Sequence, residues 1–164
     1  LGTPCTTCSR ALRQPIRSAD FPMGLESLTE SQHARLAVGS ATFLVSCRFI
    51  ECCRRARVPV FLENPDLSLM WRAPRLQQLM KANDFSEARF HQCQFGAPWK
   101  KATRVASWNG GGLFRLRRPC LAQGRICSRS GIPHQELAGR APGGRHWTAT
   151  AAAYYICIGL DNQT

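Results

Sequence analysis

A long helical pattern that runs directly into a short apolar strand is the clearest folding signal in this sequence. Apolar side chains recur at three- and four-residue steps from Ser31, the expected N-cap, to Ala56, and they include Leu36, Phe43 and Ile50. The stretch VPVFLEN that follows is β-branched and aromatic, as buried strands are. A helix joined to a buried strand predicts an α/β fold, in which polar residues at strand ends carry the chemistry.

Weaker patterns complete the predicted order of elements. The sequence predicts a strand end at residues 1–3, a helix that starts at Asn64-Pro65, a second helix at 73–81 and a strand at 87–93. Beyond Gly96, stretches rich in Gly and Pro are typical of loops, with weak strands at RVASW and HWTATAAA. The predicted fold is an alternating α/β part followed by a loop-rich part.

Length and composition limit the class of protein. The chain has 164 residues, of which 44% are hydrophobic and 20% charged, which suffices for a single core. Its longest apolar run, ATFLVSCRFI, is interrupted by Arg48 and is too short to cross a bilayer. The first twenty residues contain arginines but no apolar core of a signal peptide. We therefore expect a nuclear or cytoplasmic protein that is neither secreted nor bound to a membrane.

The cysteines suggest a reducing compartment. There are nine, an odd number, and their spacing is irregular. Without an export signal, this favours free thiols over a disulfide framework. Four cysteines in apolar or helical context are expected to act as small core hydrophobes: Cys47, Cys52, Cys53 and Cys157.

Positive charge is concentrated in the second part of the chain. The 22 basic and 10 acidic residues give a formal net charge of +12. Residues 1–96 contribute 12 basic and 8 acidic residues, or +4, whereas residues 97–164 contribute 10 basic and 2 acidic residues, or +8. Such a surface favours a polyanion, and nucleic acid is the expected partner. An ordinary solvated surface is the alternative.

Three polar motifs follow one another at the predicted strand ends. They read PCTTCS at residues 4–9, LENP at 62–65 and FGAPWKKATR at 95–104. In this order they resemble the Pro-Cys, Glu-Asn and Gly-x-Pro blocks of the DNA cytosine-5 methyltransferases, and most closely the divergent branch found in phage and mobile-element proteins. The resemblance covers most of residues 1–108 and, more loosely, the tail that contains CSRSGIPHQELAG, GRHWT and the Ala and Tyr residues after them.

The resemblance implies a catalytic pair. Cys5 would be the nucleophile whose thiolate adds to C6 of cytosine, and Glu63 would contact the ring nitrogen and amino edge of a flipped cytosine. From the residues alone, Cys5 is more readily explained as a half-buried thiol at a strand end. With Cys8 it could form a redox or zinc pair, but no thioredoxin-like helix follows, and Cys52-Cys53 is too tight to serve as the second pair of a zinc site. Glu63 can equally satisfy backbone donors at a helix start.

The resemblance also implies a nucleic-acid-binding set. The expected members are Ser9, Asn64, Trp99, Lys100, Lys101 and Arg104. The family carries a Gln-x-Arg-x-Arg run in the third block, where this chain has Trp99, Lys101 and Thr103 at the Gln and the two Arg positions. The lysines and Arg104 can still bind phosphate, and Trp99 can stack on a base or pack in a core.

The implied fold is a partial Rossmann-like methyltransferase sheet with helices on both faces, followed by a loop-rich basic segment. Residues 1–108 would be the catalytic half, and residues 109–164 a target-recognition or zinc-binding region. The F-x-G-x-G loop that binds S-adenosylmethionine in the family is absent, so we expect a fragment that needs an upstream half for this cofactor and is inactive alone. The alternatives are a catalytically dead nucleic-acid-binding module derived from a mobile element, and a decaying sequence.

A possible zinc site lies in the tail. Cys120, Cys127 and His134 recur at regular intervals, and either Cys93 or His146 could supply a fourth ligand. The spacing is not that of a standard zinc finger, so the sequence leaves both the fourth ligand and the metal itself open.

Overall fold

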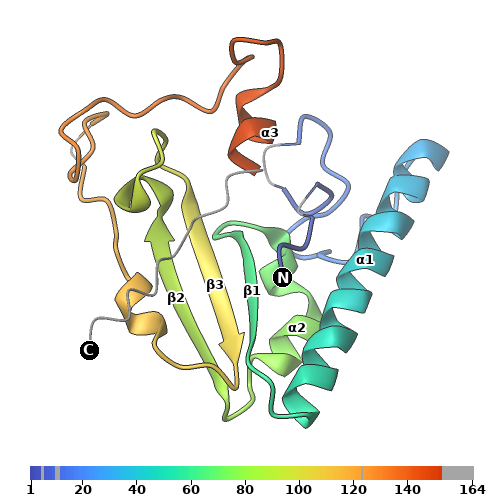
Figure 1. Ribbon diagram of the computed structural model, residues 1–164. Coiled ribbons are helices and arrows are strands. Elements are labelled where there is room, and N and C mark those ends of the chain that lie inside the picture. The colour runs from blue at the N-terminus through green and yellow to red at the C-terminus, as the bar shows by residue number, and fades with distance from the viewer. Residues whose placement is uncertain (5, 10–11, 123, 153–164) are drawn as a thin grey trace. The chain divides into compact units, whose positions relative to one another are not determined.

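The computed structural model describes residues 1–4, 6–9, 12–122 and 124–152 (Figure 1). These residues form two compact units. The first consists of residues 1–89 and 103–117, and the second of residues 90–102 with the described residues from 118 on. The units interleave along the chain, whereas the sequence suggested a single division after Trp108.

Helix α1 (Glu30–Arg55) is the longest element of the first unit. A capping box starts it: the Thr29 hydroxyl accepts from the Gln32 backbone N–H, and the Gln32 side chain accepts from the Thr29 backbone N–H. Arg54 and Arg55 lie in the last turn, where basic side chains complement the helix dipole. The predicted helix is therefore confirmed, but its cap is Thr29 and not Ser31.

Three strands form a small sheet in the order β1-β3-β2. They are β1 (Val60–Pro65), β2 (Phe85–His91) and β3 (Ala102–Trp108). β1 pairs antiparallel with β3, in a register that sets Val60 opposite Trp108 and Pro65 opposite Thr103. In Figure 1 the arrows of β2 and β3 point in opposite directions. The fold is thus mixed α/β around an antiparallel sheet.

The predicted Rossmann-like sheet is not supported, because the three strands are antiparallel. β3 enters the sheet between β1 and β2 instead of extending it at an edge. Parallel neighbours need a crossover between them, and β3 follows β2 through a short connection that contains no long helix. Parallel pairing among the described residues is limited to an isolated bridge between Gly2 and Glu63.

The core of the first unit lies between α1, β1 and the segment after β1. Phe43, Cys47 and Ile50 of α1 pack with Leu62 of β1 and with Trp108 of β3. Further core residues come from the 3-10 helix η1 (Leu69–Arg72) and from α2 (Pro74–Leu79). The indole N–H of the fully buried Trp108 donates to the Leu79 carbonyl at 2.9 Å, so the large side chain is buried without an unsatisfied donor.

Two local predictions are wrong. No helix starts at Asn64-Pro65, since β1 continues through Pro65, and Ser68 caps the 3-10 helix that follows. HWTATAAA does not form a strand in the described residues, because Trp147–Ala152 is helix α3. The predicted strands at 58–64, 87–93 and RVASW correspond to β1, β2 and β3, and the helix at 73–81 corresponds to α2.

Of the four cysteines expected in the core, two lie as predicted. Cys47 is buried, and Cys53 packs against the core from a partly buried position. Cys52 is exposed, which corrects the prediction, because it lies on the face of α1 turned away from the core. Cys157 lies outside the described residues.

The second unit has little regular structure. It contains the 3-10 helix η2 (Gln92–Phe95) and α3, joined by long loops. Trp99 and Ala97 pack with Ala151, and the rings of Trp99 and Trp147 meet edge to face at 6.5 Å. From residue 118 to 151, the buried side chains among the described residues are Cys120, Cys127 and Ala151. The buried side chains of this unit therefore form small clusters, one of Cys93, Cys120 and Cys127 and one of Ala97, Trp99 and Ala151.

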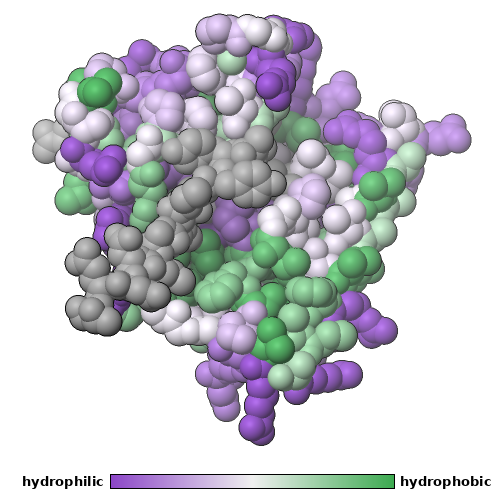
Figure 2. All heavy atoms as spheres, in the orientation of Figure 1, coloured by the Kyte–Doolittle hydropathy of each residue, from purple (hydrophilic) through white to green (hydrophobic). Residues whose placement is uncertain are grey.

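Helix α1 also exposes apolar side chains. Val38, Val45 and Phe49 are 69%, 68% and 51% exposed, and Figure 2 shows hydrophobic side chains along this helix. By length and composition α1 could cross a membrane, a test that core helices of soluble proteins also pass. The expected absence of membrane binding stays a prediction.

Candidate functional site

The residues just before the first motif pair with the second motif at one edge of the sheet. Gly2 bridges Glu63 in parallel, and the Glu63 N–H donates to the Leu1 carbonyl at 2.9 Å. One residue further on, the side-chain amide of Asn64 donates to the Thr3 carbonyl at 2.8 Å. Asn64 is 1% exposed, so this hydrogen bond is buried. The residues that precede Cys5 in the chain are thereby tied to the end of β1.

The turn that carries the first motif packs against α1. Thr7 is buried, and a Cβ at Gly39 of α1 would come within 2.3 Å of the Thr7 hydroxyl, so only glycine allows this approach. The Cys8 carbonyl accepts from the Leu69 N–H at 2.9 Å, which fastens the other end of the turn to η1. A shallow groove lies beside the turn, lined by Pro4, Thr6 and the α1 residues Arg35, Val38 and Thr42.

Of the two predicted catalytic residues, Glu63 is among the described residues. Glu63 lies on β1, is partly buried and stands opposite Val105 of β3. Cys5 lies outside the described residues. Ser9, expected to contact nucleic acid, is partly buried just after the turn. These roles stay predictions.

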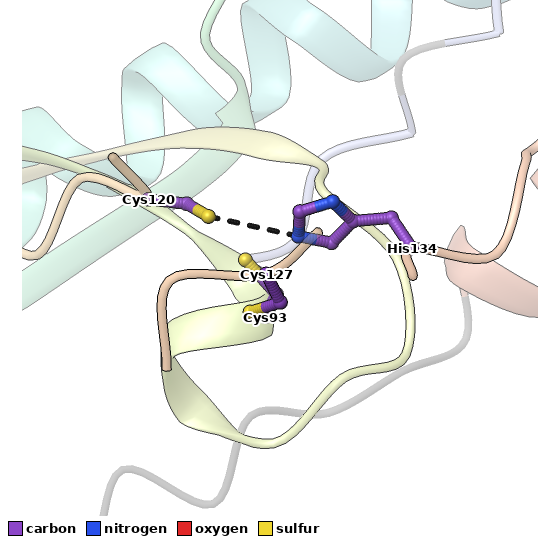
Figure 3. Close-up of side chains that lie close together, drawn as sticks. All are labelled: Cys93, Cys120, Cys127 and His134. Carbon is purple, nitrogen blue, oxygen red and sulfur yellow. Dashed lines mark hydrogen bonds between the residues drawn. The ribbon is translucent and has the colours of Figure 1, made fainter. Parts of the chain in front are cut away.

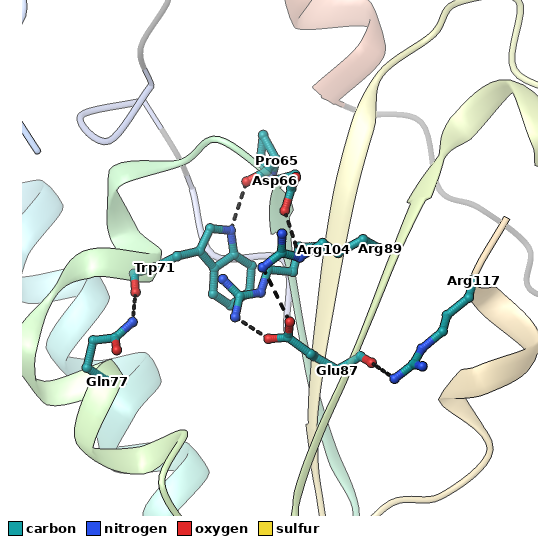
Figure 4. Close-up of polar contacts among 8 residues, drawn as sticks. All are labelled: Pro65, Asp66, Trp71, Gln77, Glu87, Arg89, Arg104 and Arg117. Atoms are coloured by element: carbon teal, nitrogen blue, oxygen red, sulfur yellow. Dashed lines mark hydrogen bonds and ion pairs between the residues drawn. The ribbon is translucent and has the colours of Figure 1, made fainter. Parts of the chain in front are cut away.

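Arg104 of the third motif belongs to a polar network in the first unit (Figure 4). Its guanidinium pairs with Glu87 of β2 and stacks on the Trp71 ring, 4.6 Å from the ring centre. The Trp71 indole N–H in turn donates to the Pro65 carbonyl at 2.8 Å. Arg104 is 8% exposed, so its charge is engaged inside the protein and not offered to a phosphate.

Residues 95–102 of the third motif belong to the second unit. Trp99 is 4% exposed, and its indole N–H donates to the Gln92 side chain at 2.7 Å. It therefore packs in the core, the second of the two roles open to it from the sequence. Lys101 is partly buried and donates to the Ala151 carbonyl at 3.2 Å, whereas Lys100 is exposed. Lys100 is thus the residue of this motif best placed to meet a phosphate.

A compact cluster of metal-ligating side chains lies in the second unit (Figure 3). It is formed by Cys93, Cys120, Cys127 and His134, whose ligand atoms all lie within 4.8 Å of one another. The Cys120 Sγ and His134 Nε2 are 3.6 Å apart. Three of the four residues were predicted from their spacing, and Cys93 rather than His146 completes the set.

Local backbone structure holds each member of the cluster. Cys93 lies in η2, which ends at Gly96 with a left-handed φ of 97°. Cys127 and His134 flank a tight turn, in which the Cys127 N–H donates to the Ile132 carbonyl and the His134 N–H to the Arg125 carbonyl. Both ligands are therefore set by backbone hydrogen bonds of one hairpin.

The three thiols differ in acidity. Burial raises the pKa of the Cys93 thiol to about 12. Burial also acts on Cys127, but hydrogen bonds from the backbone at Ser130 and Arg129 outweigh it and lower the pKa of Cys127 to about 6. For Cys120, burial is outweighed by hydrogen bonds from Ser128 and the pKa falls to about 7. The thiolate is the form of cysteine that binds metals, and the lowered pKa values of Cys120 and Cys127 favour this form.

No protein-family model and no curated protein matches the sequence, and no solved structure matches the fold.

Proposed function

We propose that this chain is the base-activating part of a DNA cytosine-5 methyltransferase-like protein. The observation that carries the proposal is the buried hydrogen bond between Asn64 and the Thr3 carbonyl, beside the parallel bridge of Gly2 and Glu63. It ties the chain just before Pro4-Cys5 to β1, the strand that contains Glu63 and Asn64. A thiol and a carboxyl group that act on one pyrimidine ring must lie close together, and these contacts hold the chain next to Cys5 beside Glu63.

The proposed chemistry uses both residues. The Cys5 thiolate supplies the electron pair of a new bond from sulfur to C6 of cytosine, while the double bond between C5 and C6 opens. The displaced electrons spread towards N3, which takes a proton from the Glu63 carboxyl group. The result is a ring that is nucleophilic at C5. Elimination of the thiolate later reverses the first step.

The groove beside the first motif does not fit S-adenosylmethionine, the methyl donor of the family. The groove beside the Pro-Cys turn offers threonines, Val38 and Arg35, but no carboxylate among its described lining residues to hold ribose hydroxyls. We therefore derive no step through this cofactor.

A basic surface supports nucleic acid as the substrate. Arg118, Arg125, Arg129, Arg140 and Arg145 are exposed in the second unit. Residues 97–164 carry a net charge of +8, which favours contacts with a phosphate backbone. This charge would serve a binding module without catalysis equally well, and that module is our second candidate function.

A covalent trapping experiment tests the proposal. A duplex that contains 5-azacytosine presents a more electrophilic C6, so a thiolate can add to it without methyl transfer. We expect the full chain to form a denaturation-resistant complex with this duplex. Cys5→Ser should abolish the complex, and Glu63→Gln should slow its formation at least about tenfold. Cys52→Ser, which changes an exposed thiol on α1, is the matched control and should trap normally.

Each outcome bears on the proposal. A complex that survives in Cys5→Ser would show that another thiol reacts, and the assignment of the nucleophile would be wrong. Duplex binding with no trapping by the wild-type chain would reject the catalytic function and favour the binding module.

A further inference from the structure

The cluster of Cys93, Cys120, Cys127 and His134 has the dimensions of a tetrahedral metal site. Bonds of about 2.3 Å from zinc to sulfur and about 2.1 Å to nitrogen place a sulfur and a nitrogen ligand about 3.6 Å apart at the tetrahedral angle. The Cys120 Sγ and His134 Nε2 are separated by 3.6 Å, and all four ligand atoms lie within 4.8 Å of one another. We propose that these residues bind one zinc ion that holds the second unit folded.

The ligand chemistry selects zinc and a structural role. Three thiolates and one imidazole suit a borderline-soft cation, whereas magnesium and calcium prefer oxygen ligands. Four protein ligands close the coordination sphere and leave no position for water or substrate, as in structural zinc sites. The site is thus separate from the chemistry proposed for Cys5 and Glu63, and does not depend on it.

The second unit needs such a site. Two of the three buried side chains among the described residues from 118 to 151 are Cys120 and Cys127 themselves. The local core around them consists of Cys93, Cys120 and Cys127, with the partly buried Ala122. The other cluster of the unit consists of Ala97, Trp99 and Ala151, with Leu137 and Trp147 packed against it. Two such small clusters offset little of the entropy of ordering long loops, and a metal ion can supply the missing free energy.

Neighbouring groups support the ligands. The Cys120 N–H donates to the His91 Nδ1 at 2.7 Å, which orients the backbone of that ligand. The Gln94 amide approaches the sulfurs of Cys93 and Cys127 at 3.6 and 3.9 Å, and the Ser128 hydroxyl lies 3.5 Å from the Cys120 sulfur. Such donors stabilise negative charge on thiolates and are typical of metal sites.

Metal analysis and cobalt substitution test the proposal on the full chain. Protein purified under reducing conditions should contain about one zinc ion per chain. Replacement by Co²⁺ should give the visible absorption of a tetrahedral site together with thiolate charge-transfer bands. Cys127→Ser should lose both, and Cys52→Ser should retain both. His134→Ala should lose the metal, whereas His134→Cys should retain it with a shifted cobalt spectrum.

The folding role has its own measurement, which needs no variant. Chelation of zinc from the wild-type chain should expose sites after residue 118 to limited proteolysis, while residues 30–89 stay protected, and added zinc should restore protection. Purified protein without zinc, with cleavage that does not respond to added zinc, would overturn the proposal. Loss of two free thiols to a disulfide within the cluster would overturn it as well.

Discussion

Arg104 shows how the position of one residue separates a structural role from a binding role. The basic motif that contains Arg104 predicts a phosphate ligand. In the structure, however, its guanidinium lies between Glu87 and the face of Trp71. Its partners come from β2 and η1, which are distant in sequence, so neither contact could be recognised in the sequence. Removing one partner of a largely buried ion pair leaves the other charge uncompensated, so Arg104 has a structural role.

This role predicts unequal costs for two arginines that contact the same carboxylate. Arg104→Ala removes a nearly buried partner of Glu87 together with its stacking on Trp71, and should lower the free energy of unfolding by about 2 kcal/mol. Arg89→Ala removes a side chain that is 58% exposed, and should cost less than about 1 kcal/mol. Urea denaturation of the zinc-loaded chain measures both values, and equal losses would contradict the structural role of Arg104.

Among the elements, α1 shows what a local pattern can and cannot predict. The apolar period predicts the helix, but Thr29 and Ser31 both stand near its start, and the pattern favours Ser31 as the cap. The structure places Thr29 there, because Gln32 lies three residues later and completes the capping box. A cap depends on the backbone conformation of one residue, which periodicity alone does not specify.

The capping assignment can be tested with two matched substitutions. Thr29→Ala removes the hydroxyl that accepts from Gln32, and should destabilise the protein by about 1 kcal/mol. Ser31→Ala changes an exposed residue inside the first turn to a better helix former, and should alter stability by no more than about 0.5 kcal/mol. Thermal unfolding followed by circular dichroism compares the two. A larger loss of stability in Ser31→Ala than in Thr29→Ala would show that Ser31 is the cap.

Strand arrangement was harder to predict than strand position. β1, β2 and β3 lie close to their predicted places, but the direction and order of pairing depend on contacts between distant segments, and the parallel arrangement was wrong. The strand prediction for HWTATAAA was wrong for another reason. Alanine and threonine in a short segment fit a helix or a strand, and the packing of Ala151 against Trp99 is compatible with the observed helix. The metal cluster was predictable in three of its four residues, whereas Cys93 could be chosen over His146 only in three dimensions.

At the scale of the whole molecule, the division into units changes how the basic segment must be studied. Deleting residues 97–164 would remove β3 from the centre of the sheet and Arg104 from its ion pair. Loss of DNA binding by such a deletion would then report unfolding of the first unit as much as loss of positive charge. Point substitutions of exposed arginines avoid this problem.

If nucleic acid binds the second unit, two pairs of exposed arginines should behave differently. Arg129→Ala with Arg145→Ala should weaken duplex binding, and should reduce the slope of log affinity against log salt by about 2, since each contacted phosphate contributes about 0.9. Arg55→Ala with Arg57→Ala, at the end of α1, removes the same charge from the first unit and should leave the slope unchanged. Fluorescence anisotropy with a labelled duplex over a series of salt concentrations measures both. Equal effects of the two pairs would mean that net charge, and not the second unit, drives binding. A wild-type affinity that salt does not change would reject phosphate contacts as its source.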